Sequence, residues 1–223
     1  MSEPIRVDIW SDIACPWCYI GKRRLEAGVA AFDSRPASPP VEIEYHSFQL
    51  SPETPVDFEG SEIDFLVAHK GLSEPQVKVM IDRVSDIART VGLEYDFDAL
   101  RHTNTVKAHQ LLHYAKAHGM QFEAKERLLR AYFIEGRHVG RSNDLADLGA
   151  EIGLDRNDVL RSLVDNEYLS AVRADQQRAV DYGISSVPFH VIDGRFGLSG
   201  AHPPDAFTDA LAQAAAARAE AVA

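Results

Sequence analysis

Hydrophobic and polar positions alternate near the start of the chain, over Ile5-Arg6-Val7-Asp8-Ile9. This two-residue period predicts a strand with one face in a core. From Pro16 the apolar spacing becomes helical, and the proline-rich residues 34–40 end that helix. Residues 41–48 alternate again and predict a second strand. A strand, a crossover helix and a second strand form a βαβ unit in the first 50 residues.

The middle of the chain, from about Ser51 to Asp165, has a mostly helical period that is interrupted at glycines. We expect several packed helices there, followed by another from about Glu167 to Asp181. Two short strands joined at Asp193-Gly194 then predict a hairpin, and Pro203-Pro204 begins a final helix.

Composition narrows the class of protein. The chain has 223 residues, 45% of them hydrophobic, and a formal charge of −11. Because a polyanion is repelled by such a surface, nucleic acid is excluded as the expected partner. The first residues do not resemble a signal peptide, and no apolar run is long enough to span a membrane. The cytoplasm is therefore the expected compartment.

The two cysteines, Cys15 and Cys18, stand in the sequence Cys-Pro-Trp-Cys where the first strand meets the helix. One close pair excludes a disulfide scaffold, which needs many cysteines spread over a short chain. A helix N-terminus lowers the pKa of a thiol, so we expect Cys15 to be the exposed nucleophile. Cys18, one helical turn later, is expected to be the more buried resolving thiol.

A metal site is the alternative use of such a pair. Zinc normally takes four ligands, and a second Cys-x-x-Cys is absent. His109 and His113 are spaced i, i+4, but nothing in the sequence links them in space to the cysteines. We therefore predict no metal site.

Two further positions bear on the chemistry. Pro188, in Ser-Val-Pro-Phe, precedes an apolar strand; a cis bond there exposes the backbone of Val187 to an extended peptide, whereas a trans bond makes it a strand-start proline. Asp12 lies close to Cys15 in sequence and either acts on that thiol, by tuning its pKa or relaying a proton, or caps the loop by a hydrogen bond. Both alternatives stay open for each residue.

The chain resembles the thioredoxin superfamily, and within it the FrnE-like branch of the DsbA-like oxidoreductases. The segments that carry the resemblance are spread over most of the chain: Ser11 to Cys18, Phe48 to Pro52, Asn104-Thr105 with Ala108-His109, Ala131 to Phe133 with Glu135-Gly136, and Val187 to Phe189 with Ser199 to Ala201.

The resemblance implies an α/β thioredoxin fold with a large all-helical insertion between the βαβ half and the ββα half. The thioredoxin-like domain would comprise residues 1–50 and 166–223, and the insertion residues 51–165. Cys15 becomes the nucleophile, Cys18 the resolving cysteine and Pro188 the cis-proline beside them. The other expected site residues support the pair or line a substrate groove: Asp12, Pro16, Trp17 and Val187 in support, and Phe48, Asn104, His109, Tyr132 and Phe133 in the groove. Each groove residue also fits a core or capping role.

The function expected from these features is thiol–disulfide exchange with a protein or small-molecule substrate. No tightly bound cofactor is expected, with glutathione as a candidate co-substrate and a homodimer compatible with the chain. Related families include glutathione-dependent hydroxychromene-carboxylate isomerases and kappa-class glutathione transferases. An isomerase or transferase acting on a small aromatic or polyketide-type compound is therefore the alternative, and a chaperone-like binding module is the third hypothesis.

Overall fold

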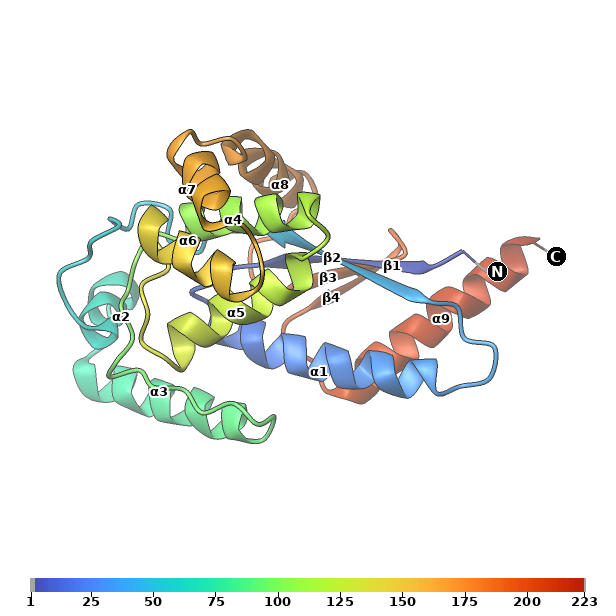
Figure 1. Cartoon of the computed structure of the whole chain (residues 1–223). Helices are drawn as coiled ribbons and strands as arrows, with labels where there is room; N and C mark the ends of the chain where they lie inside the picture. The colour runs from blue at the N-terminus through green and yellow to red at the C-terminus, as the bar shows by residue number, and fades with distance from the viewer. Residues whose placement is uncertain (1–2, 223) are drawn as a thin grey trace.

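The computed structural model of the chain describes residues 3–222 and has a four-stranded sheet with helices on both faces (Figure 1). The strands are β1 (Ile5–Ser11), β2 (Val41–Ser47), β3 (Phe189–Ile192) and β4 (Phe196–Ser199). Their order is β2-β1-β3-β4, with β1 parallel to β2 and antiparallel to β3. The predicted βαβ unit and C-terminal hairpin are therefore both confirmed.

One face of the sheet is covered by α1 (Pro16–Asp33) and α9 (Pro204–Val222), which run side by side in Figure 1. The alternating residues Ile5, Val7 and Ile9 of β1 face these helices and are at most 2% exposed. They pack with Leu25 and Phe207, and burying a side chain of this size contributes about 1.5–3 kcal/mol. The two-residue period thus has its cause in a one-sided core.

The other helices lie between β2 and β3 in the chain. They are α2 (Glu62–Lys70), α3 (Glu74–Arg89), α4 (Val106–Ala117), α5 (Gln121–Phe133), α6 (Ser142–Glu151), α7 (Arg156–Val164) and α8 (Leu169–Asp181). Helix α8 packs on both α4 and β2, while Trp10 of β1 meets Ala179 of α8 on the second face of the sheet.

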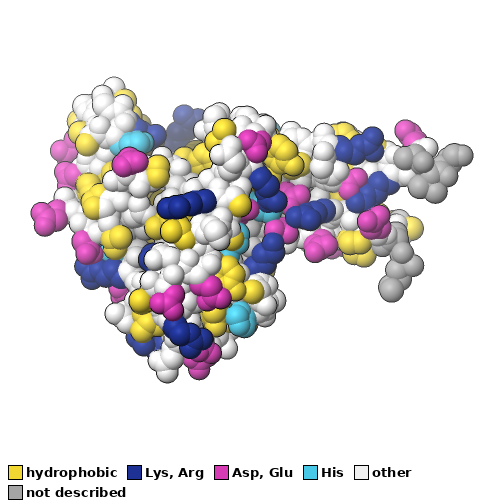
Figure 2. Space-filling view, turned by 90° about the horizontal axis from the view of Figure 1, so that it is seen from above, with side chains coloured by type: hydrophobic (Ala, Val, Ile, Leu, Met, Phe, Trp, Pro, Cys, Tyr) yellow, Lys and Arg dark blue, Asp and Glu magenta, His cyan; other side chains and the backbone are white. Residues whose placement is uncertain are grey.

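The core of the helical region extends into the segment that carries the cysteines. Ile13, Tyr19 and Ile20, which flank or follow the pair, belong to the same buried cluster as Leu128 and Phe133 of α5. This packing places the first turn of α1 between the sheet and the helical region, which forms the broad end of the molecule in Figure 2.

Both termini of the described chain lie at the opposite, narrow end (Figure 1). Residues 1, 2 and 223 of the expected thioredoxin-like segments fall outside the described residues. Among residues 3–222, no helix is both long and apolar enough to cross a bilayer.

Candidate active site

The cysteine pair lies at the junction of β1 and α1. Cys15 is the N-cap residue, with extended backbone angles, and Pro16 occupies the first helical position, where a missing N–H costs no hydrogen bond. The backbone N–H of Cys18 donates to the carbonyl of Cys15 at 3.0 Å, which closes the first turn. The two cysteines come within 3.3 Å of each other, and both thiols are free.

The loop before β3 lies opposite the pair. The Val187–Pro188 peptide bond is cis, and Cys15 Sγ lies 3.6 Å from the carbonyl oxygen of Val187. The loop is fixed from behind, because the N–H of Gly200 donates to the carbonyl of Pro188 at 2.7 Å. Residues at opposite ends of the chain thus meet at the sulfur of Cys15.

Asp12 connects the pair to the helical region. Its Oδ1 lies 3.2 Å from Nε2 of His109 on α4, and its Oδ2 accepts the N–H of Leu50 at 2.8 Å. Burial favours the protonated carboxyl, but these hydrogen bonds hold the pKa of Asp12 below its usual range. Burial lowers the pKa of His109, so a neutral imidazole donates to an ionised carboxylate. The hydrogen-bonding role expected of Asp12 is therefore present.

Lys125 of α5 is fully buried, and its Nζ has no hydrogen-bond partner among the described residues. Burial lowers its pKa to about 8. Burial also opposes ionisation of Cys18, but the hydrogen bond from Cys15 and the charge of Lys125 outweigh it and lower the pKa of Cys18. The buried cation therefore favours a thiolate at Cys18.

The pKa of Cys15 is raised instead, by its hydrogen bond to Cys18, by burial and by the negative charge of Asp12. The expected lowering of the Cys15 pKa is thus corrected, because these effects outweigh the backbone N–H of Cys18 at the helix N-terminus, which lowers that pKa. The expected difference in exposure is also wrong, since both cysteines are 3% exposed. What distinguishes them is that Cys15 lines a cavity and Cys18 does not.

This cavity of about 610 Å³ lies between the cysteine loop and helices α2 and α3. On one side it is lined by Asp12, Cys15, Pro16, Trp17 and Val187, all of them expected site residues. The opposite wall is mainly apolar and is built by Phe65, Leu66, Met80, Ile81, Val84 and Phe97. Its volume lies in the range of small-molecule sites.

The expected groove residues do not line this cavity. Tyr132 and Phe133 are 1% exposed and pack in the core of the helical region, while Phe48 packs beside Trp10. Asn104 holds the loop after β2, because its Nδ2 donates to the carbonyls of Pro52 and Thr54. These residues support the walls from behind.

Sequence reasoning missed Lys125 and the pair formed by Glu62 and His102. Glu62 Oε2 lies 2.7 Å from His102 Nδ1, both residues line the cavity, and Nε2 of His102 is buried without a hydrogen-bond partner among the described residues. A charged residue on the apolar face of α5 was the available signal for Lys125. Glu62 and His102 are 40 residues apart, and no local pattern joins them.

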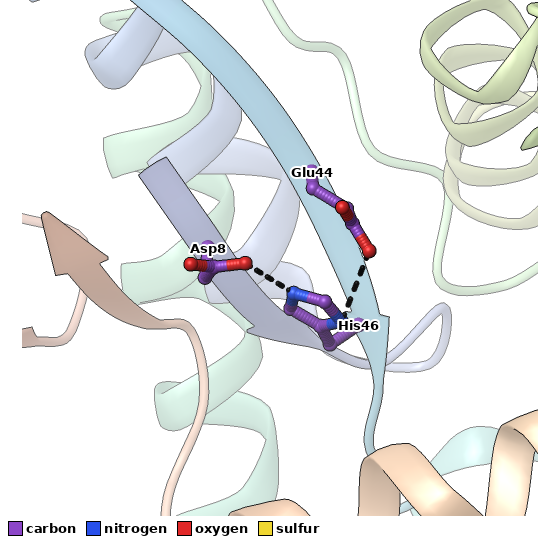
Figure 3. A group of neighbouring side chains, drawn as sticks. All are labelled: Asp8, Glu44 and His46. Carbon is purple, nitrogen blue, oxygen red and sulfur yellow. Dashed lines mark hydrogen bonds and ion pairs between the residues drawn. The ribbon is translucent and has the colours of Figure 1, made fainter. Parts of the chain in front are cut away.

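A second polar cluster lies on β1 and β2, where Asp8, Glu44 and His46 come together (Figure 3). Their potential ligand atoms lie within 4.8 Å of one another. Arg6, however, already pairs with both carboxylates, at 2.9 Å each. Burial opposes protonation of His46, but its hydrogen bonds to Asp175 and Asp8 raise its pKa. The cluster is an ion-pair network that joins the two strands.

A paired thiol centre at a strand-to-helix junction, with a cis-proline loop opposite and a helical region above, defines a dithiol protein of thioredoxin fold. The chain belongs to the DSBA-like thioredoxin domain family, which matches residues 6–212. Members of this family are oxidoreductases and isomerases. The resemblance and the fold class expected from the sequence are confirmed.

A probable DsbA oxidoreductase from Streptomyces coelicolor is 38% identical, with a TM-score of 0.86 over 94% of this chain and 89% of that one. The uncharacterised protein YwbO of Bacillus subtilis is 26% identical over 93% of this chain and 96% of its own.

Two more distant structures share the fold at 18% identity. A 2-hydroxychromene-2-carboxylate isomerase has a TM-score of 0.68, covering 97% of this chain and 98% of its own. The cytosolic disulfide reductase DsbM of Pseudomonas aeruginosa has a TM-score of 0.64, covering 93% and 97%, and has also been solved with glutathione.

Proposed function

We propose that the protein is a thiol–disulfide oxidoreductase in which Cys15 exchanges with the substrate and Cys18 resolves the mixed disulfide. One observation carries this proposal: two free thiols lie 3.3 Å apart, and Cys15 alone of the two lines a cavity. A substrate sulfur in the cavity therefore reaches Cys15 first.

The dithiol holds one proton between its sulfurs when Cys18 is the thiolate and Cys15 the hydrogen-bond donor. As Cys15 attacks a substrate disulfide, its proton passes to Cys18, one S–S bond forms, and one substrate thiolate leaves. Cys18 then gives that proton to the first substrate thiolate, attacks Cys15 Sγ, breaks the mixed S–S bond and releases the second substrate thiolate. The substrate gains two electrons and the protein ends as the Cys15–Cys18 disulfide; the reverse sequence oxidises a substrate dithiol.

The surrounding residues have positioning roles in this mechanism. The carbonyl of Val187, set by Pro188, faces the attacking sulfur, and Pro16 starts the helix that holds the second thiol. Trp17 is 39% exposed at the cavity, where it offers an aromatic face to a bound substrate. Lys125 stabilises the Cys18 thiolate in the resolving step.

The test uses Cys15→Ser and Cys18→Ser variants with oxidised glutathione, followed by mass spectrometry. Cys15→Ser should abolish exchange, whereas Cys18→Ser should accumulate a mixed disulfide at Cys15. Exchange that persists in Cys15→Ser at the wild-type rate overturns the assignment.

The second candidate is a glutathione-dependent isomerase or transferase acting on a small aromatic compound. The small-molecule dimensions of the cavity favour it, as does the fold shared with a 2-hydroxychromene-2-carboxylate isomerase. In that case Cys18→Ser should retain activity and glutathione should be obligatory. Turnover without any added thiol counts against it.

We propose that the protein acts in the cytoplasm, and the fold it shares with the cytosolic disulfide reductase DsbM supports this proposal. Glutathione, with which DsbM was solved, is a candidate co-substrate on the same basis. A chaperone-like role predicts that a variant lacking both cysteines still suppresses aggregation of a client, and no specific feature of the cavity favours that role.

A further inference from the structure

Two cations at the rim of the cavity beside Cys15 have no hydrogen-bond or ion-pair partner among the described residues. The cavity's two carboxylates, Asp12 and Glu62, are each hydrogen-bonded to a histidine, at 3.2 and 2.7 Å. Lys70 and Arg83, at the rim, make no hydrogen bond or ion pair with any described residue. In a chain with a formal charge of −11, most basic side chains are paired, so two free cations at one cavity attract an anion.

The wall between these cations is apolar. Lys70 ends α2 and Arg83 lies on α3, and the facing surfaces of these two helices contribute Phe65, Leu66 and Met80. A ligand that satisfies both parts of the lining has an apolar, ring-sized body and an anionic group at its edge. Such a ligand fits within about 610 Å³, whereas an unfolded polypeptide needs an open groove.

We infer that the preferred substrate is a small apolar disulfide or thiol that carries a carboxylate or a similar anionic group, read by Lys70 and Arg83. The inference rests on the proposed exchange function and names its substrate class. Cys15 attacks the sulfur next to the apolar body while the anionic group points to the cations at the rim. The electrons and protons balance as in the two-step exchange above, and no other reactant is required.

The test is a single turnover of the reduced protein with three disulfides. These are 5,5′-dithiobis(2-nitrobenzoate), which is aromatic and anionic; 4,4′-dithiodipyridine, which is aromatic and uncharged at pH 7; and cystamine, which is aliphatic and cationic. Each rate is divided by the rate of the same disulfide with dithiothreitol, which removes its intrinsic reactivity. The normalised rates should fall in that order.

Charge variants test whether Lys70 and Arg83 attract the anionic disulfide or change the exchange rate with every disulfide. Each exposed cation is expected to contribute roughly two- to fivefold, so Lys70→Gln/Arg83→Gln should lose about tenfold with the anionic disulfide and nothing with the neutral one. Added salt should reduce the same preference in the wild type. The matched control is Lys78→Gln/Arg89→Gln, which removes two cations that pair with Glu74 and Asp86 on α3.

The apolar wall has its own pair of variants. Met80→Gln keeps the size of the side chain at the cavity and should slow both aromatic disulfides while leaving cystamine unchanged. Val79→Gln, at a position 68% exposed, serves as its control.

The outcomes test the substrate class and the exchange function separately. Equal normalised rates for the three disulfides, or a rim variant that retains the anionic preference, overturn the substrate class and leave the exchange function standing. A neutral cystine-bridged peptide that reacts faster than all three also overturns it. Failure to react with any disulfide overturns the exchange function itself.

Discussion

Cys15 Sγ lies 3.6 Å from the carbonyl oxygen of Val187, although 172 residues separate them in the chain. The contact depends on close packing behind the loop. A Cβ added at Gly21 of α1 would lie 3.0 Å from Cγ of Pro188, so the helix approaches the loop as closely as a glycine permits. The absence of a side chain at Gly21 therefore helps to set the position of the loop opposite Cys15.

Gly21→Ala is expected to slow disulfide exchange severalfold with little change in stability. The added methyl group displaces Pro188 and with it the carbonyl of Val187, whereas alanine gains about 1 kcal/mol over glycine in a helix and offsets the crowding. Single-turnover exchange and urea unfolding measure the two effects separately. An unchanged exchange rate contradicts the positioning role.

Gly28→Ala is the matched control on the same helix. Its Cβ would lie 2.7 Å from the carbonyl oxygen of Pro204 and 2.8 Å from Cβ of Phe207, where α1 meets α9. Because backbone atoms cannot move aside easily, this variant should lose about 1–3 kcal/mol of stability. Its exchange rate per folded molecule should stay at the wild-type level.

Lys125→Met should raise the pKa of Cys18 and slow the resolving step. Methionine fills a similar volume without the charge, so the thiolate loses the cation that stabilises it. The pKa is measured from the thiolate absorbance near 240 nm, and the lifetime of the glutathione mixed disulfide by rapid acid quench and mass spectrometry.

Lys22→Met is the control for that variant. Lys22 is also buried, on the helix of the cysteines, but its ammonium already pairs with Glu26 and Glu126 at 2.5 and 2.6 Å. Its loss should leave the thiol titration unchanged. If Cys18 has the wild-type pKa in Lys125→Met, Lys125 does not stabilise the Cys18 thiolate.

Asp12→Asn should lower the pKa of Cys15, because the carboxylate is one of the groups that raise it. The amide can still accept from Leu50 N–H and donate to neutral His109, so the loop keeps its connections. At a pH below the pKa of Cys15, each unit by which that pKa falls should raise the attack rate by about threefold. The larger thiolate fraction outweighs the weaker nucleophilicity of the thiolate. Stopped-flow oxidation between pH 5 and 8 gives the profile, with Asp181→Asn as a surface control. A slower reaction with an unshifted profile indicates a structural role alone.

His190 of β3 should make the protein less stable in mild acid. The ring is 1% exposed against Phe207, and burial lowers its pKa to about 4. Since an unfolded histidine titrates near 6.5, the unfolded chain binds more protons between these values. The free energy of unfolding should therefore fall as the pH drops from about 6.5 to 4, by up to about 1.4 kcal/mol per unit, and be unaffected by this group above 6.5.

Urea unfolding at pH 7, 6 and 5 checks this slope by comparing the wild type with His190→Gln, which does not titrate. The variant should show a flatter dependence. Equal slopes in the two proteins assign the acid sensitivity to other groups.

The regular helices and strands were predictable from the sequence because an element buried on one side has apolar residues at a regular spacing. The alternation at Ile5 to Ile9, the proline that starts α1 and the turn at Asp193-Gly194 are local signals, and all three elements formed as expected. The cysteine pair and Pro188 were found because their motifs are short. The approach of Pro188 to the pair followed from the family resemblance.

The walls of the site were not predictable by the same means. Phe65, Met80 and His102 meet only after α2 and α3 fold back over the cysteine loop, and their spacing resembles that of any amphipathic helix or loop. Tyr132 and Phe133 were expected near the groove, yet aromatic side chains at adjacent positions fill the core of the helical region equally well. Charges such as Lys125 change the thiol chemistry from a distance in sequence that no motif spans.

The buried ammonium of Lys125 also links the redox state of the Cys15–Cys18 pair to the stability of the folded protein. When Cys15 and Cys18 join, the thiolate disappears and α5 retains a buried charge without its main counterion. On the proposed function, we expect this buried charge to stabilise the dithiol relative to the disulfide and so to raise the reduction potential of the pair. Lys125 is then expected to favour oxidation of a substrate dithiol by the Cys15–Cys18 disulfide, while α2 and α3 form a wall of the cavity.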